Sequence, residues 1–115
     1  MTNYFNEQIA DLVRKRKQAY IIYKIVSDAH QVNIHDLNTK RRGVTLAKPL
    51  LKSRIALYCA FRQLGYTRKD ISNITGRDTT TINRGWRLHR DMLKDEDYKS
   101  KWAQIESALD GLESL

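Results

Sequence analysis

At 115 residues the chain has the length of one domain, and it carries a net charge of +8. A domain of this size can bury a small core without a disulfide or a metal. The single cysteine has no partner for an internal disulfide, which fits a reducing, cytoplasmic location. The sequence holds no apolar run of about 18 residues and no signal-peptide pattern, so we expect no membrane span. With one proline and five glycines, the composition favours an all-α single domain over residues 1–115.

The positive charge is concentrated in the middle of the chain. Between Lys40 and Arg90 there are thirteen lysines and arginines against two acids, whereas residues 91–115 hold seven acids and three lysines. A basic middle section between neutral and acidic ends is a localised positive field, as expected of a protein that binds a polyanion. The alternative is that these residues only make the surface soluble.

Apolar residues recur at helical spacing through residues 1–31, which predicts one long helix or two helices with a bend. This spacing leaves a basic belt over residues 14–17 that either contacts phosphates or faces water. Residues 32–37 are too short and mixed for more than one turn of helix. A basic loop is expected over residues 40–48.

A further helix is expected from Pro49 to about Leu64, where Gly65 favours a stop. Its predicted apolar face consists of Leu51, Ile55, Tyr58, Cys59 and Phe61. Inside such a face, Cys59 is expected to be a core thiol rather than a nucleophile.

Residues 67–93 carry the signals of a helix-turn-helix. Thr67 and Asp70 are spaced as a capping box, which begins a short helix with Ile71 and Ile74 facing inward. Residues 75–77 contain the glycine that ends it. Asp78 is expected to cap the next helix, which runs to about Leu93. A short helix, a turn with glycine and a longer helix form the helix-turn-helix pattern. The inward side of the second helix is predicted to hold Ile82, Trp86, His89 and Leu93.

In a helix-turn-helix the N-terminal residues of the second helix contact base edges in the major groove. Here Thr79, Thr80 and Thr81 stand at that end, with hydroxyls that donate and accept and methyl groups that pack on thymine. The alternative is that they only cap the helix. We also predict a face opposite to the inward side that meets bases and phosphates. It consists of Asn83, Arg87 and Arg90.

Residues 76–82, Gly-Arg-Asp-Thr-Thr-Thr-Ile, resemble the signature of the C-terminal DNA-binding domain of the replication initiator DnaA, in which Gly-Arg-Asp-His-Thr-Thr is typical. The similarity extends over about residues 20–100. It includes residues 32–37 before a basic loop, residues 54–58 as an Arg-led entry into an apolar helix, and residues 67–71. The resemblance implies a DnaA-C-terminal-like, Trp-repressor-like helical fold that binds duplex DNA.

The resemblance also implies roles for individual residues. Arg42 would enter the minor groove from the basic loop, where an arginine is favoured by the negative potential of a narrow groove. The alternative for this loop is a solvated surface. Together with the expectations from the helix pattern, the predicted major-groove residues are Lys69, Arg77, Asp78, Thr79, Thr80 and Asn83. The predicted phosphate contacts are Lys40, Arg41, Arg68, Thr81 and Arg87.

The sequence departs from the family in three respects. Thr79 replaces the usual histidine at a base-contacting position, the turn before Gly76 is about one residue shorter, and residues 40–54 are about three residues longer. These differences put the family's usual target sequence in doubt. The phosphate-binding loop of the initiator's ATPase domain is absent. We therefore expect a stand-alone regulator of transcription or replication, encoded on a phage or mobile element.

Two other classes of function are considered. A helix expected over residues 97–115 is acidic and carries an apolar stripe, which favours self-association or a protein partner. The alternative for this stripe is packing on the domain's own helices. An enzyme is not expected, because no catalytic pattern is present and His30, His35 and His89 lack the neighbours of a zinc site. We expect no cofactor. The apolar stripe consists of Trp102, Ile105, Leu109, Leu112 and Leu115.

Overall fold

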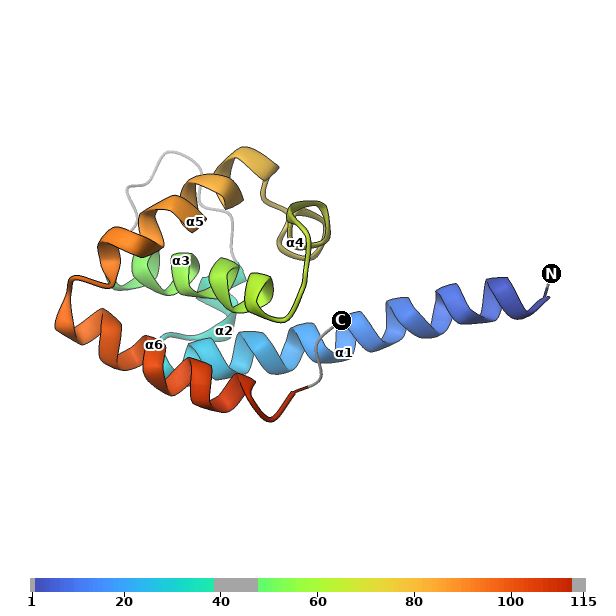
Figure 1. Cartoon of the computed structure of the whole chain (residues 1–115), viewed down its shortest axis with the longest axis horizontal. Coiled ribbons are helices and arrows are strands. Elements are labelled where there is room, and N and C mark those ends of the chain that lie inside the picture. Colours follow the sequence, from blue (N-terminus) through green and yellow to red (C-terminus); the bar gives the residue numbers. More distant parts are fainter. Residues whose placement is uncertain (1, 39–47, 113–115) are drawn as a thin grey trace.

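The computed structural model describes residues 2–38 and 48–112, with side chains from residue 13 and residue 50 onward in these two ranges. All regular structure within them is helical, which confirms the predicted all-α class for this part of the chain (Figure 1). The basic loop at Lys40–Arg42 and the terminal Leu115 lie outside the described residues. In chain order the helices are α1 (Thr2–His30), α2 (Ile34–Asn38), α3 (Lys48–Gln63), α4 (Arg68–Thr75), α5 (Thr79–Met92) and α6 (Glu96–Leu109).

Helix α3 is the centre of the domain. It lies between α5 on one side and α1 with α6 on the other, and every side chain from Ser53 to Phe61 is buried (Figure 1). A helix that is buried all round is expected at the middle of a core rather than at its surface. Pro49 stands in the first turn, where a missing N–H is harmless. Leu51 was predicted to face the core, but it is 42% exposed, because it lines an open groove between α3 and α5 with Ile55 and Leu88.

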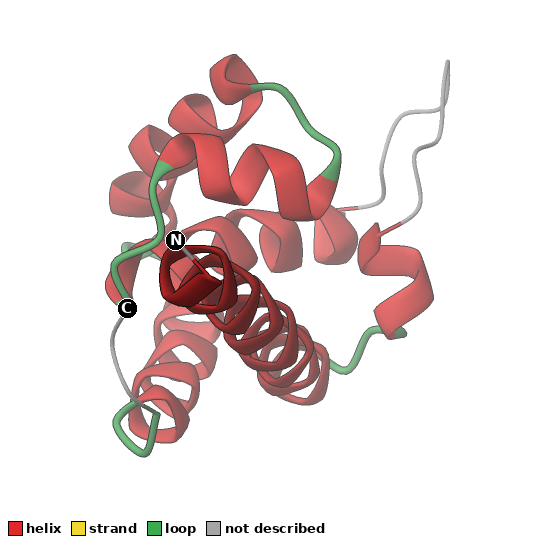
Figure 2. Ribbon diagram, turned by 90° about the vertical axis from the view of Figure 1, so that its right-hand side faces the viewer, coloured by secondary structure: helices red, strands yellow, loops and turns green. Residues whose placement is uncertain are grey.

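Helix α1 is continuous, so the bend that the sequence left open is not present. Its C-terminal half packs on α3 and α6 through Ala19, Ile22 and Val26, while its N-terminal half extends away from the other helices (Figure 1). Figure 2 looks along this helix and shows the other helices behind and around it. A membrane-spanning helix needs about 20 largely apolar residues, and none of the described helices meets that requirement.

Helix α6 packs against α1 and α3 with its apolar stripe inward. Trp102, Ile105 and Leu109 are each less than 8% exposed, and Leu112 packs on the same core. The described part of the stripe therefore follows the alternative in which it packs on the domain's own helices. The helix ends at Leu109, earlier than expected, and Asp95 begins it by accepting a hydrogen bond from the backbone N–H of Tyr98.

One close contact sets the spacing between α3 and α5. A Cβ atom added to Gly85 would lie 2.7 Å from Cδ2 of Tyr58, a ring that is only 5% exposed. We expect Gly85→Ala to lower the free energy of unfolding by about 1–3 kcal/mol, because overpacking outweighs the better helix propensity of alanine. Urea denaturation followed by circular dichroism measures this loss. Gly111→Ala is the matched control, since its Cβ would lie 3.7 Å from its nearest neighbour, and an equal loss in both variants would contradict the prediction.

The contact between α1 and α6 makes folding sensitive to pH. His30 is 5% exposed, its Nε2 has no hydrogen-bond partner, and its ring lies 5.9 Å from that of Tyr98. Burial, helped by the charge of Lys101, lowers the pKa of His30 to about 4. The imidazole of His30 therefore binds a proton near pH 6.5 in the unfolded chain but not in the folded chain. The free energy of unfolding falls as the pH drops through this window.

We expect the free energy of unfolding to fall by about 1 kcal/mol between pH 7.5 and pH 5.5, above the range where carboxylates titrate. Burial also lowers the pKa of His89, which adds a change in the same direction. His30→Gln should reduce the pH dependence, and the exposed His35→Gln should leave it unchanged. Urea titrations at the two pH values measure this, and a His30→Gln variant with the full pH dependence of the parent would contradict it.

Candidate nucleic-acid interface

Helix α4 begins and ends as the sequence predicts. Thr67 accepts a hydrogen bond from the backbone N–H of Asp70, and the Asp70 carboxylate accepts one from the N–H of Thr67 at 3.1 Å. This reciprocal pair is a complete capping box. At the other end Gly76 has φ +71°, a left-handed conformation that favours glycine, and its N–H donates to the carbonyl of Ser72. The turn therefore holds α4 and α5 in a defined relation.

Helix α5 is also capped as predicted, because Asp78 accepts a hydrogen bond from the N–H of Thr81 at 2.8 Å. Its rotation about its own axis is set by packing on α3. Ile82 and Gly85 are buried, and Nε1 of Trp86 donates to the carbonyl oxygen of Tyr58 at 3.1 Å. With these residues held against α3, the opposite side of α5 is left facing solvent.

The outward side of α5 combines threonine hydroxyls with arginines. Thr80, Arg84 and Arg87 follow one another at spacings of four and three residues, so they lie on the same strip of the helix. Arg84 was not predicted as a site residue, although its spacing from Thr80 and Arg87 could have indicated it. The predicted residues Arg68 and Lys69 are exposed on the neighbouring α4. The exposed residues of this side of α5 are Thr79, Thr80, Thr81, Arg84, Arg87, Arg90 and, near the C-terminal end, Asp91.

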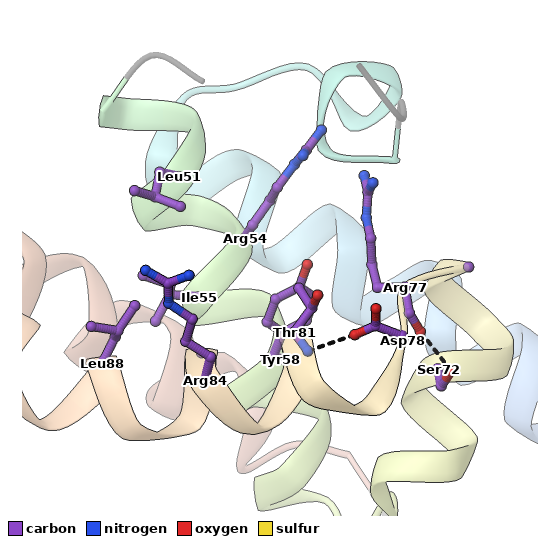
Figure 3. Close-up of a pocket in the computed structure, with 12 residues that line it drawn as sticks. Leu51, Arg54, Ile55, Tyr58, Ser72, Arg77, Asp78, Thr81, Arg84 and Leu88 are labelled. Carbon is purple, nitrogen blue, oxygen red and sulfur yellow. Dashed lines mark hydrogen bonds between the residues drawn. The ribbon is translucent and has the colours of Figure 1, made fainter. Parts of the chain in front are cut away.

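Arg77 lies apart from this strip. It lines a groove of about 710 Å³ between α3 and the N-terminal half of α5, together with Tyr58, Thr81 and Arg84. Figure 3 shows its guanidinium pointing to the same side as that of Arg54, whose Nη2 donates to a carbonyl oxygen of α2 at 3.0 Å. Burial raises the pKa of Tyr58, while the positive charge and the hydrogen bond of Arg77 oppose the rise. Arg77 is thus half-buried beside α3 rather than fully presented to solvent.

The sequence predicts that Asn83, Arg87 and Arg90 lie on the face opposite to Trp86. The structure does not have this arrangement. They line one pocket of about 510 Å³ with Trp86 itself and with Arg62 and Arg68. The reason is helical geometry, because Trp86 is only about 40–60° around the axis from Asn83 and Arg90. Sequence reasoning missed Arg62, which reaches this pocket from the C-terminal end of α3.

The two acids of the basic middle section are engaged in the helix caps. Partial burial alone would raise the pKa of Asp70, but hydrogen bonds from Thr67 and the nearby Lys15 ammonium lower it below its usual value. Its carboxylate lies 3.6 Å from Nζ of Lys15. Among the described residues, no carboxylate forms an ion pair with any arginine on the exposed sides of α3, α4 and α5. These arginines are Arg62, Arg68, Arg84, Arg87 and Arg90.

The remaining chemistry-bearing side chains have structural roles. Cys59 is buried, and burial raises the pKa of its thiol to about 12, so the sequence's expectation of a core thiol is confirmed. Nδ1 of His89 shares a hydrogen bond with the hydroxyl of Tyr98 at 2.7 Å. In the described part of the chain, no three histidine, cysteine or carboxylate side chains come together as metal ligands would.

Comparison with known proteins does not assign the chain to a group. No protein-family model, no curated protein and no solved structure matches it. The function is therefore argued from the charges, exposure and spacing of the residues described above.

The capping box predicts a measurable contribution to stability. Thr67→Ala should lower the free energy of unfolding by about 1 kcal/mol, because the N–H of Asp70 loses its acceptor. Thr67→Ser keeps the hydroxyl and should lose no more than a few tenths of a kcal/mol. Thermal and urea denaturation of the two variants measure the difference. Equal stability of the two would show that the cap does not hold the start of α4.

Proposed function

We propose that this chain binds duplex DNA through a helix-turn-helix formed by α4, residues 76–78 and α5. In this proposal the N-terminal end of α5 enters the major groove. The observation that carries it is the outward side of α5, where exposed threonine hydroxyls precede arginines that form no ion pair with a carboxylate of the described residues. Hydroxyls at the start of a recognition helix suit base edges, and guanidinium groups further along suit phosphates.

The length of α5 agrees with this division of roles. A helix rises about 1.5 Å per residue, which separates Thr80 from Arg87 by about 10 Å along the axis. The major groove is about 12 Å wide. A helix that contacts bases with its first turn therefore brings its middle close to a groove wall, where the phosphates lie.

The sequence similarity to the DnaA C-terminal domain supports the same function. Gly76 and Asp78, which belong to the similar segment, are the residues that end α4 and cap α5. By this resemblance Arg42 contacts the adjacent minor groove, and Lys40 and Arg41 contact phosphates. The chain would then act as a regulator of transcription or replication.

The alternative of a protein-interaction module is less favoured. It was based on the acidic, apolar-striped C-terminal helix, and the described residues of that stripe are packed on α1 and α3. The proposal of DNA binding still has an exposed surface whose positive charge is opposite to that of its ligand. The protein-interaction alternative no longer has an available apolar stripe among the described residues to support it.

Substitution of the threonines tests whether α5 recognises the base sequence of the DNA. On a duplex obtained by selection from a random library, Thr79→Ala or Thr80→Ala should weaken binding by about 1–3 kcal/mol. The slope of log affinity against log salt concentration should not change, because threonine carries no charge. Asp78 caps α5 and is kept in both variants, and circular dichroism checks that each variant is folded. Fluorescence anisotropy of the labelled duplex at several salt concentrations measures both quantities.

Ser100→Ala, at an exposed position of α6, is the matched control and should bind like the parent. Threonine variants with the parent's affinity on the selected duplex would show that the start of α5 does not contact bases. A parent protein that binds no duplex at low salt would overturn the proposed function as a whole.

A further inference from the structure

The pocket around Trp86 gathers four arginines from three helices. Arg62 comes from the end of α3 and Arg68 from the first turn of α4, while Arg87 and Arg90 come from the middle and last turns of α5. Arg62 and Arg68 are close in the sequence, but Arg87 and Arg90 on α5 are well separated from them, so the fold brings the four together. None of the four guanidinium groups is ion-paired within the described residues.

Trp86 holds part of this cluster in place. The guanidinium carbon of Arg62 lies 4.5 Å from the centroid of the Trp86 ring, and that of Arg68 lies 6.0 Å from it. Both distances fall within the range of cation–π attraction. The ring is itself fixed by its hydrogen bond to Tyr58. Two arginines that would otherwise repel each other are thus both held beside one aromatic ring before any ligand binds.

Four positive charges around one hollow favour an anionic ligand. Guanidinium groups donate planar, forked pairs of hydrogen bonds that match the oxygens of phosphate, and the half-buried amide of Asn83 adds a further polar group at the pocket wall. A backbone phosphate carries one negative charge, but its two free oxygens accept hydrogen bonds from more than one guanidinium group, and its neighbours along the strand add further negative charge.

We infer that this pocket binds a phosphate of the DNA backbone and so fixes the angle at which α5 enters the groove. The inference rests on the proposed function and adds α3, through Arg62, to the DNA-binding surface. Arg90 lies about 15 Å along the helix from Thr80, which places the pocket near the strand at the edge of a groove about 12 Å wide. Since a phosphate is the same in every sequence, this contact contributes affinity without specificity.

The test replaces Arg62, which the sequence did not single out, and Arg90, which the sequence placed on a face that meets bases and phosphates. Arg62→Gln/Arg90→Gln should weaken binding of any duplex by at least about tenfold at moderate salt. It should also lower the salt slope by about one unit, the value for one lost phosphate contact. Anisotropy of the selected duplex and of an unrelated duplex measures both, and the two losses should be equal.

A matched control removes two positive charges from elsewhere on the surface. Lys24→Gln/Lys99→Gln, with one exposed lysine on α1 and one on α6, should keep the parent's slope. Circular dichroism checks that all variants fold. Tryptophan emission adds a local readout, because the chain has only two tryptophans and Trp102→Phe leaves Trp86 alone in the pocket. Titration with duplex should change the emission of Trp86 until the protein is saturated.

Three results would overturn the inference. If the double arginine variant binds duplex with the parent's affinity and slope, the pocket holds no backbone phosphate, although the proposed function survives. If inorganic pyrophosphate saturates the Trp86 signal through these arginines while duplex affinity does not depend on them, the ligand is a free polyphosphate. If the parent binds no duplex, both this inference and the proposed function fail.

Discussion

The close approach of α5 to α3 is the contact on which the candidate interface depends. Gly85 allows the two helices to meet over the ring of Tyr58, and the backbone of the same tyrosine accepts the hydrogen bond of Trp86. Because one side of α5 packs on α3, its other side presents threonines and arginines to solvent, together with Asp91 near the C-terminal end. The packing of the core thus determines which side chains of α5 are available for binding, although none of the apolar core residues belongs to the proposed binding surface.

The same arrangement of helices has an electrostatic cost for folding and would have an electrostatic benefit for binding a polyanion. Like charges gathered on one surface oppose folding. Asp70 and Asp78 cap the helices, and no carboxylate of the described residues pairs with Arg62, Arg68, Arg84, Arg87 or Arg90. A cation–π platform at Trp86 offsets part of the cost of gathering these charges. A bound polyanion would offset more of it, which is the physical basis for the nucleic-acid ligand that we propose.

Features set by neighbouring residues could be predicted from the sequence. The capping box at Thr67, the glycine turn at Gly76 and the cap at Asp78 depend on spacings of a few residues, and the structure has all three. Features that depend on residues far apart in the sequence could not be predicted in this way. The exposure of Leu51 and the meeting of Arg62 with Trp86 depend on how α3 packs on helices elsewhere in the chain. Periodicity within one helix carries no information about such neighbours.

The central claim is that α5 and the arginine pocket together form a surface that binds duplex DNA. The most direct measurement is an NMR titration of isotope-labelled protein with the selected duplex, following backbone amides and arginine side chains. The account predicts that the largest shifts occur at Thr79, Thr80 and the arginines of α5 and at Arg62, with α6 nearly unchanged. Shifts confined to α6, or no shifts at any duplex concentration, would contradict it.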